Sequence, residues 1–115
     1  MDVPKDVQDK LAQFQNLQNQ LQVIAMQKQQ LMLQGTDLGN ARKELEALSD
    51  GKVYRMVGPL FLEVGKDDGL KYVVDESETA AAKVKVLEKQ EKKLTEKLTE
   101  MRGEIQTMLQ PPKAG

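Results

Sequence analysis

Hydrophobic side chains recur at alternating three- and four-residue steps along two long stretches of this chain, separated by a short segment rich in glycine. The first series consists of Val7, Phe14, Leu17, Leu21, Ile24, Leu31, Leu38 and Leu45. The second series consists of Leu70, Val73, Ala80, Val84, Leu87, Leu94, Leu98, Met101, Ile105 and Met108. This spacing is typical of helices that pack as a coiled coil, and it predicts helices over residues 5–49 and 67–110.

Two features of the first stretch work against a helix. Its glutamine-rich composition also occurs in disordered segments. Gly35 and Gly39 each cost a helix about 0.5–1 kcal/mol relative to alanine. The apolar series nevertheless continues on both sides of these glycines, so we expect a helix whose local continuity is open at that point.

The ends of the second stretch carry signals for the start and the stop of a helix. Asp67 or Asp68 is predicted to act as the N-cap, because a short carboxylate accepts hydrogen bonds from the first free backbone amides. Pro111 and Pro112 cannot continue a helix. Residues 111–115 are therefore expected to form a loose tail.

Residues 50–66 predict a β-hairpin. Two short runs, Lys52–Val57 and Leu60–Val64, flank the turn pair Gly58-Pro59. Both faces of such a ribbon are largely apolar, and an isolated two-stranded ribbon is only marginally stable in water. We therefore expect other subunits to bury it in a sheet or barrel; the alternative is a hairpin packed onto its own helices. The residues expected in this contact are Val53, Tyr54, Met56, Val57, Leu60, Phe61, Leu62 and Val64.

The two predicted helices have nearly equal length, so we expect them to fold back on each other about the hairpin. The predicted fold is mainly α: one domain over residues 1–115, with two long helices in an antiparallel coiled coil joined by a β-hairpin. Pairing centred on Gly58-Pro59 places Lys28 near Glu91, to within about one turn of helix. Both are polar residues on the apolar series, as are Lys10 and Arg42 on the first series and Ser77 on the second, and we expect the pair Lys28 and Glu91 to set the helix alignment.

Composition narrows the chemistry that the chain can perform. Among its 115 residues there are 17 Lys plus Arg against 18 Asp plus Glu, and neither cysteine nor histidine occurs. Their absence excludes disulfides, thiolate nucleophiles and zinc sites built from nitrogen or sulfur ligands. The two serines, Ser49 and Ser77, have no histidine to activate them. We therefore predict no catalytic residues, no metal and no cofactor, and a protein that is not an enzyme.

Neither hydropathy nor charge points to a membrane or a nucleic acid as partner. The longest uninterrupted apolar run, Val23–Met26, is far too short to span a bilayer, and the start of the sequence lacks the apolar core of a signal peptide. We expect a cytoplasmic protein. Between Lys83 and Glu104, five acidic residues interrupt seven basic ones, a mixture that favours a solvated face over a nucleic-acid-binding arm, the less favoured alternative.

Apolar residues also gather at the helix ends that lie away from the hairpin. Leu11 and Leu109 lie outside the main series, so they have no obvious partner within the helix pair. The methionines at these helix ends suit adaptable contact with varied sequences. We expect partial exposure and contact with unfolded polypeptides at Val7, Leu11, Phe14, Ile105, Met108 and Leu109. The alternative is a structural scaffold or adaptor that uses its arms as spacers.

Three segments carry a resemblance to a known family. The hairpin string VYRMVGPLFLEV, the helical string VLEKQEKKLTEKL and the ending QPPKAG resemble the β-type subunits of the prefoldin family, archaeal and eukaryotic. This resemblance implies a heterohexamer with two α and four β subunits, in which the hairpins form a β-barrel platform that carries six coiled coils. It also implies binding of unfolded polypeptides without ATP and their delivery to a group II chaperonin.

Overall fold

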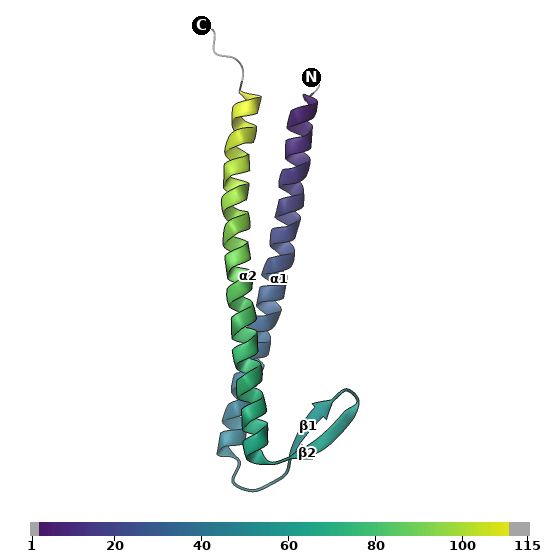
Figure 1. The fold of residues 1–115 in the computed structure, drawn as a ribbon, viewed down its shortest axis with the longest axis vertical. Helices are drawn as coiled ribbons and strands as arrows, with labels where there is room; N and C mark the ends of the chain where they lie inside the picture. The colour runs from purple at the N-terminus through teal and green to yellow at the C-terminus, as the bar shows by residue number, and fades with distance from the viewer. Residues whose placement is uncertain (1–2, 111–115) are drawn as a thin grey trace. The chain divides into compact units, whose positions relative to one another are not determined.

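The computed structural model describes residues 3–110, which form four elements (Figure 1). Helix α1 spans Lys5–Ala47, strands β1 and β2 span Val53–Val57 and Leu60–Val64, and helix α2 spans Lys66–Leu109. The strands form one antiparallel two-stranded sheet. The prediction of two long helices with a β-hairpin between them is confirmed. The tail predicted at residues 111–115 lies outside the described residues.

Helix α2 begins one residue earlier than predicted. The backbone amide of Gly69 donates to the carbonyl of Gly65 at 2.9 Å, and this is the first hydrogen bond of the helix. Gly65 therefore occupies the N-cap position, and the prediction of Asp67 or Asp68 as N-cap is wrong. Both aspartates lie in the first turn, where their negative charge faces the partial positive charge of the helix N-terminus.

Helix α1 is continuous through both of its glycines and ends two residues earlier than predicted. At its end the amide of Leu48 donates to the carbonyl of Leu45 at 3.2 Å, a tighter bond that closes many helix C-termini. Gly51 follows with a φ of 127°, a conformation that favours glycine over residues with a Cβ. The chain can therefore leave the helix and turn toward β1.

The hairpin turn explains the Gly58-Pro59 pair. The strands pair with Val53 opposite Val64 and Val57 opposite Leu60, which leaves two residues in the turn. Gly58 has a φ of 58°, and the ring of Pro59 holds its φ near about −65°. A positive φ followed by a negative one is the pattern of a type II′ turn, whose twist matches that of antiparallel strands.

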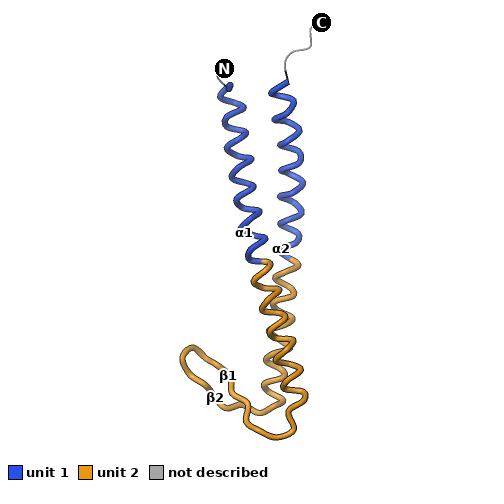
Figure 2. Tube along the Cα trace, turned by 180° about the vertical axis from the view of Figure 1, so that it is seen from behind, with its two compact units in different colours: residues 1–27, 86–115 blue, residues 28–85 orange. Residues whose placement is uncertain are grey.

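The chain divides into two compact units (Figure 2). We call residues 3–27 and 86–110 the helix-end unit, and residues 28–85 the hairpin unit. The buried hydrophobic residues of the helix-end unit are Val7, Leu98, Met101 and Ile105, and those of the hairpin unit are Val73 and Ala80. All six belong to the two apolar series, so the core of each unit is a narrow helix–helix seam.

Three elements of the hairpin unit meet at Gly69. A Cβ added at Gly69 would lie 3.2 Å from Val53 Cγ1 and 3.8 Å from Leu45 Cδ1. The first distance is shorter than an ordinary contact between carbon atoms, so α1, β1 and α2 approach closely because this position has no side chain. None of the described helical segments combines the length and apolar character needed to cross a bilayer.

Candidate functional site

The helix-end unit leaves three of the six predicted client-contact residues exposed. Leu11 on α1 and Met108 and Leu109 on α2 are exposed, and Phe14 is half-buried. Val3 is exposed as well. Sites of this kind need apolar surface without a partner in the chain, and the end of the helix pair provides it.

The expectation that Val7 and Ile105 are partly exposed is wrong. Val7 is only 2% exposed and Ile105 is also buried. Both belong to the apolar series of their helices, and the two helices of this unit pack along that series close to their ends. These side chains therefore hold the helix ends together, and the exposed apolar surface lies beside them.

An ion pair joins the two helices in the same region. The Lys10 ammonium pairs with the Glu104 carboxylate, and both side chains are partly exposed. Pairing centred on Gly58-Pro59 places Lys10 opposite Met108, so the observed alignment differs from the predicted one by about one turn of helix. The sequence pattern did not predict this pair, although Lys10 falls on the apolar series of α1, where a charged residue favours a partner across the seam.

The hairpin presents apolar side chains on both of its faces. Tyr54 and Met56 lie on one face with Phe61, which is directly opposite Met56. Val53, Arg55 and Val57 lie on the other face, because successive side chains of a strand alternate. Of the eight predicted contact residues, Val53 and Val64 are half-buried and six are exposed: Tyr54, Met56, Val57, Leu60, Phe61 and Leu62.

The root of the hairpin packs on the helices of its own unit, and the remainder of the ribbon does not. The Arg55 guanidinium carbon lies 3.9 Å from the centroid of the Tyr72 ring. Beside this contact lies a groove of about 490 Å³, lined by residues of α1, β1 and α2 that include Leu45, Val53 and Val73. The alternative of a hairpin packed onto its own helices therefore holds for the root of the ribbon, whereas Phe61 and its neighbours are exposed.

The predicted register pair falls in two different units. Lys28 belongs to the hairpin unit and Glu91 to the helix-end unit, so their pairing stays a prediction. Within residues 3–110, no group of three or more acidic side chains is placed to hold a metal ion.

Comparisons with known proteins agree on one family. The sequence profile of the family described as "Prefoldin subunit" matches residues 8–111. "Prefoldin subunit beta" of Thermococcus kodakarensis is 40% identical over 114 residues, which cover 98% of this chain and 97% of that protein. The same subunit of Thermococcus onnurineus is 39% identical over 110 residues, 95% of each chain.

A solved structure shows the same fold. The crystal structure of the prefoldin beta subunit from Thermococcus strain KS-1 superposes with a TM-score of 0.84 at 39% sequence identity. The match covers 96% of this chain and 98% of that one. Two long helices with a hairpin between them are therefore found in both proteins.

Proposed function

The chain belongs to the prefoldin family of chaperone subunits, and from this premise we propose that it captures unfolded polypeptides at the ends of its two helices. The observation that carries the proposal is the exposed apolar surface of the helix-end unit, formed by Leu11, Met108 and Leu109. Unfolded chains expose apolar side chains that folded proteins bury, so such a surface discriminates between the two states. Phe14, half-buried beside it, extends the surface.

Val7 and Ile105 are the buried neighbours of this surface. Because they are buried between the helices, they hold the backbones that carry the exposed residues. Client contact at these two positions would require the helix ends to separate. We therefore place the client-binding surface on Leu11, Met108 and Leu109, with Phe14 at its margin.

The hairpin is the proposed assembly element. Burial of one large apolar side chain contributes about 1.5–3 kcal/mol, and six such residues of this ribbon are exposed in the single chain. The open strand edges offer backbone groups to further strands. We infer that hairpins of several subunits combine into a barrel, in a hetero-oligomer with an α-type prefoldin subunit; two α and four β subunits are the stoichiometry expected for the family.

Assembly makes weak individual contacts sufficient for capture. Several helix-end surfaces in one complex hold one unfolded chain through multivalency, so no single surface needs high affinity. A client held between arms cannot meet another client, and release needs only competition by a partner such as a group II chaperonin. This mechanism uses no ATP and no covalent step. It also fits a cytoplasmic protein that catalyses no reaction.

The test is the triple variant Leu11→Gln/Met108→Gln/Leu109→Gln in the assembled complex. These substitutions keep helix-compatible side chains and leave the buried residues untouched, unlike removal of the helix ends. We expect the oligomer mass to be unchanged, while suppression of the aggregation of urea-unfolded lysozyme, followed by light scattering, falls strongly. Val86→Gln on the exposed side of α2 is the control. Full protection by the triple variant would overturn the proposed site.

A further inference from the structure

One exposed side of α1 in the helix-end unit carries a second surface, whose own residues are uncharged. Its members are separated by steps of three and four residues and are all exposed: Leu11, Gln15, Asn19, Gln22 and Met26, with Val23 beside them. This spacing places them along one side of the helix. We call these six residues the uncharged strip. Gln15, Asn19 and Gln22 border the seam, because they line a cleft of about 510 Å³ together with Leu21 and with Thr95, Leu98, Thr99 and Arg102 of α2.

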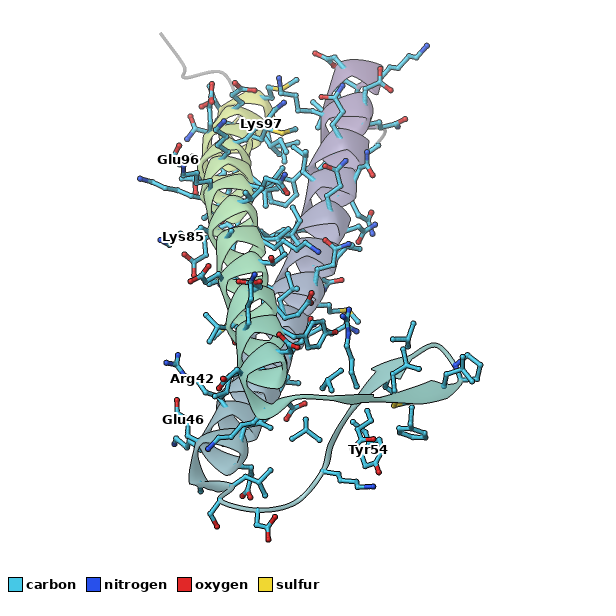
Figure 3. All side chains as sticks on the ribbon, turned by 60° about the horizontal axis from the view of Figure 1, so that its bottom comes forward. Arg42, Glu46, Tyr54, Lys85, Glu96 and Lys97 are labelled. Atoms are coloured by element: carbon cyan, nitrogen blue, oxygen red, sulfur yellow. The ribbon has the colours of Figure 1, made fainter. Side chains whose placement is uncertain are left out.

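The neutrality of this strip is not the ordinary condition of an exposed helix. No charged residue occurs in α1 between Lys10 and Lys28. The recommended charged content for the surface of a soluble protein is roughly 25–35%. Helix α2 in the same unit shows that ordinary condition. Its charged residues between positions 86 and 102 are Glu88, Lys89, Glu91, Lys92, Lys93, Glu96, Lys97, Glu100 and Arg102, and Glu96 points away from α1 (Figure 3).

Two large apolar side chains are left open in the strip. Val23 is 53% exposed and Met26 is 63% exposed. Val23 also lines a shallow cleft of about 340 Å³, together with Asn19, Gln20 and Ile24. An apolar side chain of a partner can therefore contact Val23 at this cleft, while Met26 adapts its shape because its side chain is unbranched and flexible.

We propose that the uncharged strip is a second contact surface for unfolded polypeptide, continuous with the helix-end surface through Leu11. The proposal rests on the proposed chaperone function and extends it along the arm. An unfolded chain exposes apolar side chains and unpaired backbone N–H and C=O groups. Glutamine and asparagine amides each donate and accept hydrogen bonds, so Gln15, Asn19 and Gln22 match the peptide groups, while Val23 and Met26 match the side chains.

The absence of charge favours the same occupant. A charged surface binds selectively by charge, and burial of its charges against an apolar segment carries a desolvation cost. The six residues of the strip avoid both effects, as a binder of many unrelated sequences requires; Arg102 of α2 borders them at the cleft that Gln15, Asn19 and Gln22 line. A helix from a second copy of this chain is a poorer occupant, because a coiled-coil seam needs apolar residues at nearly every three- or four-residue step. Between Leu11 and Met26 the strip offers Gln15, Asn19 and Gln22 instead.

Site-directed photocrosslinking tests the location of the contact. The chain has no cysteine, so Val23→Cys and Val86→Cys each accept one benzophenone label before assembly with the partner subunit. Val86 is the matched control because it is 55% exposed on charged α2. With urea-unfolded lysozyme as the client, we expect crosslinks from position 23 and few from position 86. Equal crosslinking at both positions, or crosslinks from position 23 only to other subunits, would overturn the proposal.

A binding measurement separates this proposal from the chaperone function itself. We expect Val23→Gln/Met26→Gln to weaken client binding by about five- to tenfold, a change of roughly one decade or less in the dissociation constant, whereas Val86→Gln has no effect. One outcome is that the double variant binds the client as strongly as the wild type, in a complex that loses protection when Leu11, Met108 and Leu109 are replaced. That result would reject the uncharged strip as a contact surface and leave the helix-end surface in place. A wild-type complex that binds no client would reject both.

Discussion

The guanidinium group of Arg55 lies over the ring of Tyr72, at 3.9 Å from the ring centroid, and joins β1 to α2. Arg55 is the polar residue on the strand face that it shares with Val53 and Val57. Val53 packs close to Gly69 on the same helix. These two contacts hold the root of the hairpin against the beginning of α2. The direction in which the exposed part of the ribbon extends from the helices of the hairpin unit depends on them.

Replacing Tyr72 by leucine is expected to loosen the hairpin. A cation–π contact at a partly exposed site contributes about 0.5–1 kcal/mol, and leucine keeps the apolar volume without the ring. We expect faster hydrogen exchange at the backbone amides of β1 and β2 and unchanged exchange in the helix-end unit. Tyr72→Phe is the control because phenylalanine keeps the aromatic face. If both variants exchanged at the same increased rate, the tyrosine hydroxyl and not the cation–π contact would hold the hairpin.

A second contact joins the beginning of α2 to the end of α1. The Lys66 ammonium donates to the carbonyl of Leu48 at 2.8 Å and to that of Glu46 at 3.3 Å. These carbonyls lie at a helix C-terminus, where partial negative charge gathers and helical partners are missing. Helix α1 has no basic residue in its own last turn, so Lys66 supplies this charge from the next helix.

Removal of the Lys66 charge is therefore expected to destabilise the protein. We predict that Lys66→Met lowers the free energy of unfolding by about 0.5–1.5 kcal/mol, the usual value of one net hydrogen bond, and that the loss shrinks as salt is added. Thermal unfolding at low and high ionic strength measures both effects. Lys71→Met, an exposed lysine on the same helix, is the control. An equal effect at both positions would show that only net charge matters.

The glycines of the helices are expected to respond differently to alanine. A Cβ added at Gly35 or Gly39 meets nothing within 4 Å, so each substitution is predicted to stabilise the chain by about 0.5–1 kcal/mol through helix propensity alone. At Gly69 the added Cβ approaches Val53 to 3.2 Å, and this crowding offsets the gain. Thermal unfolding of the three single variants, with the oligomer mass checked, should rank Gly69→Ala below the other two. A loss of stability at Gly35 or Gly39 would reveal a close neighbour in the assembled complex.

Local patterns predicted the elements well because the residues within each element determine its type. The three- and four-residue steps from Val7 to Leu45 mark α1, and Gly58-Pro59 marks the turn. The sequence pattern specifies the contacts between elements less directly. The approach of β1 to α2 at Tyr72 depends on the path of the chain through Gly51 and Gly65, whose backbone angles a hydrophobic pattern does not specify.

The exposure of individual residues at the helix ends was harder to predict for the same reason. Val7 and Ile105 belong to the apolar series, which indicates burial, but their position near the helix ends led to the prediction of partial exposure. How far the seam extends depends on the alignment of the two helices. A shift of the helix alignment by about one turn brings Lys10 to Glu104. With this alignment the helices pack as far as Val7 and Ile105, which are buried. The exposure of Val23 and Met26, by contrast, follows from their positions outside the series.

The Lys10–Glu104 pair offers a direct test of that alignment. Because both side chains are partly exposed, the pair itself contributes only about 0.2–1 kcal/mol. The single variants Lys10→Glu and Glu104→Lys each place like charges across the seam, and we expect faster hydrogen exchange in the first turns of α1 and the last turns of α2. The double variant Lys10→Glu/Glu104→Lys restores opposite charges and should restore slow exchange, with all differences reduced at high salt. If the increase in exchange rate of the double variant equalled the sum of the two single increases, Lys10 and Glu104 would not be neighbours, and the observed alignment of the helix-end unit would be contradicted.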